Sequence, residues 1–311
     1  MRYDYGFDKN RPDKAEYFYA AWREISFHPH GILGQAGQFQ GNVGRGLDPL
    51  PGRVDFQEIS GYLELAAAGR ASAFVEVPFR ILRLSNLFLD QPKDNFATDP
   101  EPRAPDPHES LEQAQTNAGG LSDVVLGFKL AILRDPDRYF TFQFRTFFPS
   151  GDSRNGAGTG HYSVEPGLLY YRRLAQRWTV QSQFKVWLPI DGTRDVTTGT
   201  SFAGNILIYG AGLGYDLVQR DNFRLTPIAE FVGWTILNGF ESLFGTGFDQ
   251  FGVLPENHGV GDVSGQTIIN AKFGVRAYFG AKDDVYVGFG QALTTARWYN
   301  EIIRVEYRRS W

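Results

Sequence analysis

The sequence predicts an all-β protein, namely a transmembrane, antiparallel, up-and-down β-barrel of twelve strands. Three observations lead to this prediction. Apolar and polar residues alternate with a period of two through most of the chain after residue 54, the pattern of strands with one apolar face. Short and long connections alternate between these strands, as in outer-membrane barrels. No apolar run approaches the roughly 18 to 20 residues of a membrane-spanning helix.

Composition agrees with a chain of many strands and turns. Glycine occurs 36 times in 311 residues and 15% of residues are aromatic, which favours strands over helices. The mean hydropathy is -0.31, which suits a barrel because only alternate residues face lipid. Cysteine is absent, which excludes disulfides and thiolate chemistry. The net charge of -4 gives no indication of nucleic-acid binding.

The first 53 residues have the least regular pattern. We expect residues 1–53 to hold a periplasmic or plug-like part together with the first strand, and residues 54–311 to form the barrel. The first strand is expected within 24–42, because the later strands number eleven and bacterial barrels have even numbers. Met1 and the residues after it form no basic and apolar leader. We interpret Met1 as a replaced start on a mature, exported chain, with a cytosolic protein as the alternative.

Each later strand is expected from its own alternation. In 57–65, Ile59 lies on the apolar face and Glu58 on the polar face. In 75–81, Pro78 removes one hydrogen bond from the ladder. The other strands are expected at 124–132, 139–145, 162–171, 178–190, 207–217, 223–234, 269–279, 285–290 and 303–311.

The connections fall into two classes that predict the two sides of a barrel. Short turns are expected at 68–70, 134–138 and 172–177, facing the periplasm, with long loops on the other side. A soluble β-sandwich, the less favoured alternative, would not sort its connections in this way. Aromatic residues near strand ends agree with interfacial girdles; they are Tyr162, Tyr170, Trp178, Tyr209, Tyr215, Phe223, Phe279, Tyr307 and Trp311.

The inward face of the predicted strands carries basic and acidic residues in near balance. This balance fits either a salt-bridged, closed lumen or a narrow polar channel. Asp216 and Arg224 flank one turn symmetrically, so we expect a cross-strand ion pair there. The residues expected to line the pore are Glu76, Arg80, Lys129, Arg145, Glu165, Lys185, Asp216, Arg224, Glu230, Lys272, Arg276, Arg304 and Glu306.

The loop 235–265 is too apolar for an ordinary solvated loop. Phe240, Phe244 and Phe248 are spaced four apart, so on a helix they would share one face. We expect this constriction loop to fold over the mouth and to narrow the pore. The alternative is that the three rings pack on the outer rim or on a neighbouring subunit.

No residue pattern predicts an enzyme, a cofactor or a metal site. All five histidines lie in the N-terminal region or in loops, and no predicted strand places a serine and a histidine side by side as a catalytic pair would require. His28 and His30 flank a proline, which indicates a turn rather than a pair of metal ligands. The stretch 156–160 lacks the lysine of a phosphate-binding loop and predicts a flexible outer loop.

Several short motifs resemble one known family. The strand and turn motifs begin at Gly120, Phe148, Glu165, Asn270 and Ile303, and read GLSDVVLGFK, FPSGD, EPGLL, NAKFGVR and IRVEY. They resemble outer-membrane proteins of the meta-pathway phenol-degradation family, often described as transporters. The resemblance covers roughly residues 54–311, and it implies a barrel and the uptake of small, including aromatic, compounds.

These observations together predict an outer-membrane channel for the passive uptake of small solutes, apolar or aromatic compounds among them. The alternative is a structural or anchoring barrel with a salt-bridged, closed lumen. The expected partners are outer-membrane lipid, small-molecule solutes and the barrel-assembly machinery, which would read the C-terminal strand ending at Trp311. Arg309 departs from the apolar residue usual in such a signal. We expect no nucleic-acid partner, and an oligomer is compatible with the sequence.

Overall fold

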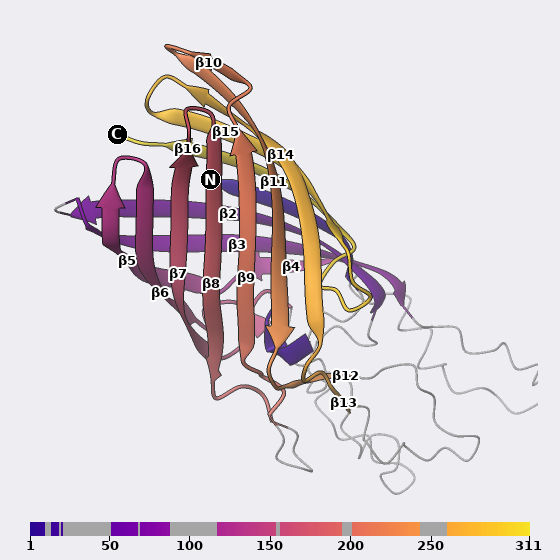
Figure 1. The fold of residues 1–311 in the computed structure, drawn as a ribbon. Helices are drawn as coiled ribbons and strands as arrows, with labels where there is room; N and C mark the ends of the chain where they lie inside the picture. Colours follow the sequence, from indigo (N-terminus) through magenta and orange to yellow (C-terminus); the bar gives the residue numbers. More distant parts are fainter. Residues whose placement is uncertain are drawn as a thin grey trace, which may run out of the picture.

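The computed structural model describes residues 1–9, 14–18, 20, 51–67, 69–87, 117–153, 156–194, 201–242 and 260–311. Within these residues, twelve strands form one closed antiparallel barrel, which confirms the predicted fold class (Figure 1). In ring order they are β1 (Arg2–Lys9), β2 (Pro51–Ala67), β3 (Ala71–Leu87), β5 (Val124–Asp135), β6 (Arg138–Phe148), β7 (Tyr162–Leu174), β8 (Trp178–Ile190), β9 (Ile206–Tyr215), β11 (Phe223–Ile236), β14 (Thr267–Phe279), β15 (Asp283–Ala292) and β16 (Glu301–Arg309).

The shorter elements extend or cover this ring. β4 (Asn117–Leu121) pairs with β3 ahead of β5, and β10 (Val218–Arg220) pairs with the start of β11. β12 (Phe240–Ser242) and β13 (Val260–Asp262) form a small separate sheet. A short 3-10 helix, η1 (Lys14–Glu16), follows β1. Among the described residues, no helix is long and apolar enough to cross a membrane.

The barrel is closed by β1, at the very start of the chain. β1 pairs with β16 from Arg2↔Glu306 onward and with β2 from Arg2↔Ser60 onward. The sequence predicts the first strand within residues 24–42, which lie outside the described residues. In the structure β1 occupies the position of that strand, between β2 and β16. The expected position of the first strand was therefore wrong. In β1 (RYDYGFDK) the outward residues Tyr3 and Tyr5 are tyrosines, so the apolar face is less pronounced than on the later strands.

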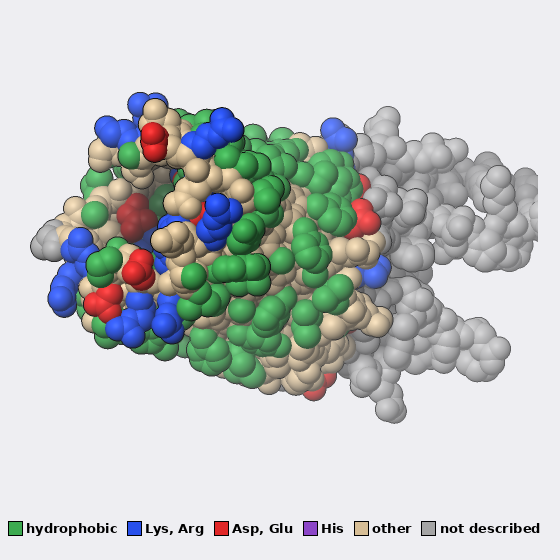
Figure 2. Space-filling view, turned by 45° about the horizontal axis from the view of Figure 1, so that its top comes forward, with side chains coloured by type: hydrophobic (Ala, Val, Ile, Leu, Met, Phe, Trp, Pro, Cys, Tyr) green, Lys and Arg blue, Asp and Glu red, His purple; other side chains and the backbone are tan. Residues whose placement is uncertain are grey.

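The outer wall of the barrel is apolar. On β5, Leu126 and Phe128 are each 46% exposed, whereas Val125 between neighbouring outward positions is 3% exposed. Exposed apolar side chains on the other strands include Ile59, Phe79, Leu168, Phe184, Leu213, Phe231, Phe273, Phe289 and Ile303. They form the hydrophobic surface that covers much of the wall in Figure 2. Such a surface is stable only when lipid covers it.

The two ends of the barrel differ as the connection lengths predict. The tight turns and both termini lie at one end, and the longer connections lie at the other (Figure 1). At the turn end, the amino group of Met1 donates a hydrogen bond of 2.8 Å to the carbonyl oxygen of Tyr307. We call these two sides the turn end and the loop end.

Gly127 on β5 gives a test of packing against the inner wall. A Cβ atom at this position would lie 2.3 Å from the ring of Phe74 and 2.5 Å from the carbonyl oxygen of Phe144. We expect Gly127→Ala to destabilise the barrel by roughly 1 to 3 kcal/mol, because the ring must leave its packed position. A folded barrel and its heat-denatured form migrate differently on gels. The temperature at which the mobility changes therefore measures this loss of stability. Gly61→Ala is the control, since its nearest neighbour is 3.9 Å away; equal shifts for both variants would contradict the prediction.

Candidate functional site: the barrel lumen

Inward-facing side chains form three layers between the loop end and the turn end. On β2 the inner row runs from Phe56 near the loops, through Glu58, to Glu64 near the turns. On β8 the inner row begins with Trp187 near the loops, and Lys185 is the next inward residue toward the turns. The lumen therefore has an apolar layer at the loop end, an ion-pair layer in the middle and a polar mouth at the turn end.

The apolar layer consists of buried side chains from the loop-end halves of several strands and from the loop before β16. Trp187 is 2% exposed, and Ile206 and Trp298 are fully buried. The cluster comprises Ala15, Val54, Phe56, Leu82, Ala118, Trp187, Ile206, Ile208, Trp234, Ile236, Val263, Ile268, Trp298, Tyr299 and Ile302. A hydrophobic core of this kind inside a barrel narrows the lumen at this level.

The centre of this layer is filled by the segment after β1, which we call the insert (the described residues 14–18 and 20). The ring of Tyr17 lies 5.2 Å from that of Trp187 and 5.2 Å from that of Trp298, measured between centroids. The ring of Phe18 lies 5.3 Å from that of Trp298. The Nζ atom of Lys9, at the end of β1, is 3.6 Å from the centroid of the Phe18 ring.

Polar contacts from the loop-end connections hold the insert at both of its ends. Its first residues are bound to the connections after β8 and β11, and its last described residue to the connection after β6. The contacts are Lys14 Nζ to Gln266 Oε1 at 2.9 Å, Lys14 Nζ to Glu241 Oε2 at 3.2 Å, Thr193 N to Glu16 Oε2 at 3.0 Å, Gly204 N to the Ala15 carbonyl oxygen at 3.2 Å and Ala20 N to the Gly158 carbonyl oxygen at 3.3 Å.

The connection after β6 turns inward rather than outward. The carboxylate of Asp123 accepts hydrogen bonds from Gly151 N at 3.1 Å, Thr159 N at 2.7 Å and the Thr159 hydroxyl at 2.8 Å. Ala157 is fully buried. The prediction of a flexible outer loop at 156–160 was therefore wrong. The Asp123 carboxylate accepts hydrogen bonds from the backbone of this connection and holds the connection beside the insert.

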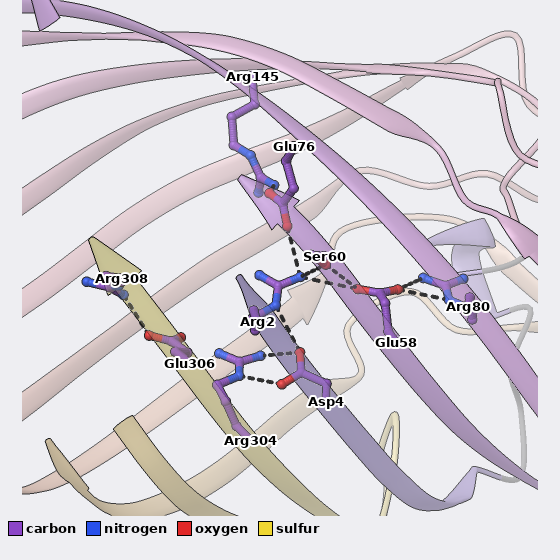
Figure 3. Close-up of polar contacts among 10 residues, drawn as sticks. All are labelled: Arg2, Asp4, Glu58, Ser60, Glu76, Arg80, Arg145, Arg304, Glu306 and Arg308. Carbon is purple, nitrogen blue, oxygen red and sulfur yellow. Dashed lines mark hydrogen bonds and ion pairs between the residues drawn. The ribbon is translucent and has the colours of Figure 1, made fainter. Parts of the chain in front are cut away.

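The ion-pair layer is a connected network along the inner wall from β8 to β16, and Figure 3 shows most of it. Arg2 is its branch point, since its guanidinium contacts three carboxylates. The pairs are Lys185–Glu165 at 3.3 Å, Glu165–Arg145 at 3.1 Å, Arg145–Glu76 at 2.9 Å, Glu76–Arg2 at 2.9 Å, Arg2–Glu58 at 3.2 Å, Glu58–Arg80 at 2.7 Å, Arg2–Asp4 at 3.1 Å and Asp4–Arg304 at 2.6 Å.

The remaining residues that the sequence predicts for the pore also lie on the inner face, in smaller groups. Arg276 pairs with Glu306 at 2.8 Å and also with Asp284. Lys129 pairs with Glu64 at 2.7 Å. On the wall opposite the network, Glu230 accepts a hydrogen bond from Gln181 and stands across from Lys272 in the register of β11 and β14.

The expected pair of Asp216 and Arg224 forms, but it is not the main contact of either side chain. Arg224 Nε lies 3.8 Å from Asp216, whereas Arg173 Nη2 lies 2.8 Å and the Thr226 hydroxyl 2.7 Å from it. The Arg224 guanidinium lies over the ring of Tyr278 at 3.8 Å. Arg173 competes because β7 brings it to Asp216 across β8, a contact that symmetry about one turn cannot predict.

The turn-end mouth contains a cavity of about 480 Å³. Its wall includes Arg220, Arg224, Lys282 and Asp284, together with the ring of Tyr278. Figure 2 shows this end as a hollow with acidic side chains inside and basic side chains around its rim. The lumen is thus wide and polar at the turn end and filled by apolar rings at the loop end.

His161, at the loop-end edge of β7, links the insert to this wall. Its Nε2 lies 3.5 Å from Glu16 Oε2, and its Nδ1 lies 3.1 Å from the Ser163 hydroxyl. Burial lowers the pKa of His161, although the nearby Asp123 opposes the shift. The neutral ring is therefore the form that the closed arrangement favours.

We expect acid to loosen the insert. If the insert leaves, His161 regains an ordinary pKa of about 6.5 and takes up a proton below that pH, whereas in the closed state it resists protonation. The contribution of His161 to the stability of the closed state is complete above about pH 6.5 and falls as the pH drops. The ratio of closed to open molecules decreases by at most about tenfold per pH unit. Conductance measured from pH 7 to pH 5 should rise, and His161→Gln should flatten the rise. An unchanged profile in that variant would contradict the prediction.

A family model described as "Putative MetA-pathway of phenol degradation" matches residues 81–297, which is more than half of the chain. The chain belongs to this family. The resemblance that the motifs indicate is thereby confirmed. A comparison with curated proteins finds no match.

Among solved structures, the COG4313 outer membrane channel from Pseudomonas putida F1 is similar to this family member over 99% of this chain and 92% of that chain, with 12% identity and a TM-score of 0.52. The likeness concerns the fold alone. The β domain of the Bordetella autotransporter Brka matches over 100% and 98% of the two chains with 12% identity and a TM-score of 0.47. The NanC porin matches over 83% and 94% with 9% identity and a TM-score of 0.45.

In this member of the phenol-degradation family, sequence reasoning missed the residues that organise the lumen. Arg2 and Asp4 escaped because β1 was not expected, although their alternation with Tyr3 and Tyr5 is a usable signal. The insert has no such signal. Of the expected constriction loop, Phe240 lies half-buried in β12, and the other two phenylalanines, Phe244 and Phe248, lie outside the described residues.

Proposed function

We propose that the protein is an outer-membrane channel for the passive entry of small solutes, and that apolar or aromatic compounds are among them. It performs no chemical reaction in this proposal. Lipid covers the apolar outer wall, the barrel-assembly machinery reads the strand that ends near Trp311, and residues 1–53 supply both the closing strand β1 and the insert, which acts as a plug.

The layering of the lumen is the observation that carries this proposal. A solute arriving from the loop end meets a layer of aromatic and aliphatic side chains before it meets the charged layer. Rings and apolar bodies gain contacts in the first layer, whereas bare ions lose hydration there without compensation. Once past it, a solute faces a polar wall and the cavity at the turn-end mouth. This order favours small solutes with an apolar part over ions.

A structural or anchoring barrel is the second candidate, and the ion-pair network favours it. The network residues satisfy one another: Glu165 is 2% exposed and contacts both Arg145 and Lys185. A filling of this kind rigidifies a barrel without needing a solute. The same residues would serve a channel equally well if only the insert moves.

Planar-bilayer recording separates the two candidates. We expect the purified barrel to give small, discrete conductance steps in KCl that apolar aromatic solutes reduce. A bilayer that stays silent across a range of voltages, with barrels shown to be inserted by their heat-modifiable mobility, would contradict the channel and leave the anchoring role.

A further inference from the structure

Tyr17 of the insert sits in an arrangement that resembles a bound aromatic ligand. Its ring stands nearly perpendicular to that of Trp187, at an interplanar angle of 87°, and is tilted by 33° from that of Trp298. The ring of Phe18 is edge-on to it at 4.8 Å. Aromatic pairs at these distances and angles attract one another beyond the area that they bury. Trp187 and Trp298, which come from opposite parts of the barrel, therefore form a cage for one planar ring.

The cage also offers polar groups to a ring substituent. Trp234 belongs to the same apolar cluster, and its buried Nε1 has no hydrogen-bond partner among the described residues. Trp298 is fully buried, and its Nε1 has no hydrogen-bond partner among the described residues. Buried donors normally have an acceptor, so an orphan donor here indicates that the cage is suited to a ligand with an acceptor atom.

The insert is attached in a way that lets the ring exchange. Its polar contacts to the loops are made by Lys14, Glu16 and Ala20, on either side of Tyr17. Within the described part of the chain, the Tyr17 side chain contacts the rings of Phe18, Trp187 and Trp298 and makes no side-chain hydrogen bond. A solute that reproduces those contacts can take its place while the insert remains tethered.

We propose that the cage of Trp187 and Trp298 is a solute-binding site for planar aromatic rings that carry a hydrogen-bond acceptor, and that Tyr17 is its tethered occupant. A solute and Tyr17 compete for the same space. Binding of the solute displaces the ring that helps to close the lumen, so the solute opens its own path. The opening of a path by the solute rests on the proposed channel function, whereas the binding of the solute in the cage does not.

Binding of p-cresol, which is the tyrosine side chain as a free molecule, tests the site. Tryptophan fluorescence of the intact chain in detergent reports on occupancy. We expect Tyr17→Ala to bind p-cresol roughly tenfold more tightly than the wild type, because the wild type binds only in the fraction of molecules with Tyr17 displaced. Tyr17→Ala/Trp298→Leu should lose this gain. The saturated analogue methylcyclohexanol and the acceptor-free toluene should bind Tyr17→Ala more weakly than p-cresol.

Tyr307→Ala, which removes an exposed tyrosine of the outer wall at the turn end, should bind as the wild type does, and unchanged heat-modifiable mobility shows that each variant is folded. Equal affinity of Tyr17→Ala and wild type, or equal binding of p-cresol and methylcyclohexanol, would overturn the site. Because binding is measured without a membrane, a barrel that binds p-cresol but never conducts contradicts only the channel, and one that conducts without the affinity gain contradicts only the cage.

Discussion

Replacing residues 14–20 by a flexible Gly-Ser segment of equal length should raise the single-channel conductance severalfold. The insert places Tyr17 and Phe18 in the centre of the apolar layer, where their rings contact Trp187 and Trp298. The replacement removes the rings that fill the centre of this layer, so the passage at this level should widen. Planar-bilayer recording measures the change directly.

The control for this replacement is a Gly-Ser substitution of the turn 136–137 between β5 and β6, which lies at the opposite end of the barrel and outside the lining of the turn-end cavity. It should leave conductance unchanged. If the variant without the insert conducts no better than the wild type, then the insert does not limit ion passage. Another part of the chain must then obstruct the lumen.

Glu165→Gln should have the largest effect on stability and on ion preference. Glu165 is 2% exposed and is the carboxylate between Arg145 and Lys185, at 3.1 and 3.3 Å. Without its charge, two cations face each other on the inner wall. Breaking a buried ion pair from one side costs roughly 3 to 5 kcal/mol. The heat-modifiable transition should fall accordingly, and the reversal potential in a KCl gradient should shift toward anion preference.

Two further variants separate charge from packing at this position. Glu165→Gln/Lys185→Met removes one charge of each sign and should recover part of the lost stability, together with the original reversal potential. Glu64→Gln removes a carboxylate whose side chain is 29% exposed and which pairs with Lys129; solvent screening should keep its effect small. Equal losses for Glu64→Gln and Glu165→Gln would show that burial of the network contributes nothing.

The strands of this barrel are predictable because lipid imposes one rule on every one of them. Leu126, Phe128 and their counterparts must face outward, so the period of two survives even where Pro78 interrupts the hydrogen-bond ladder. β1 follows the rule less clearly because its outward residues Tyr3 and Tyr5 are tyrosines rather than aliphatic residues. The inner face is predictable in composition for the same reason, since whatever does not face lipid faces the lumen.

The partners of the inner charges depend on shear and on contacts across intervening strands, which sequence spacing does not encode. Arg173 reaches Asp216 across β8, and Arg145 reaches Glu76 across β5. The inward fold of the connection after β6 depends on one carboxylate, Asp123, that lies outside the connection itself. Such long-range contacts decide where the lumen narrows, and they become visible only in the structure.

A reversible lock on the insert tests most directly whether it gates the lumen. The chain has no cysteine, and a Cβ atom at Gly160 would lie 4.0 Å from the Cβ atom of Ala20, within the range of a disulfide. Gly160 has a φ of +76° and its Cβ would lie 3.2 Å from Ser153, so the single variant Gly160→Cys also serves as the control for strain. Single-channel recording of Ala20→Cys/Gly160→Cys should show suppressed conductance when the disulfide is formed and recovery on addition of reductant, while each single variant ignores the reductant. Conductance that is the same in the oxidised and reduced double variant would contradict a gate formed by the insert.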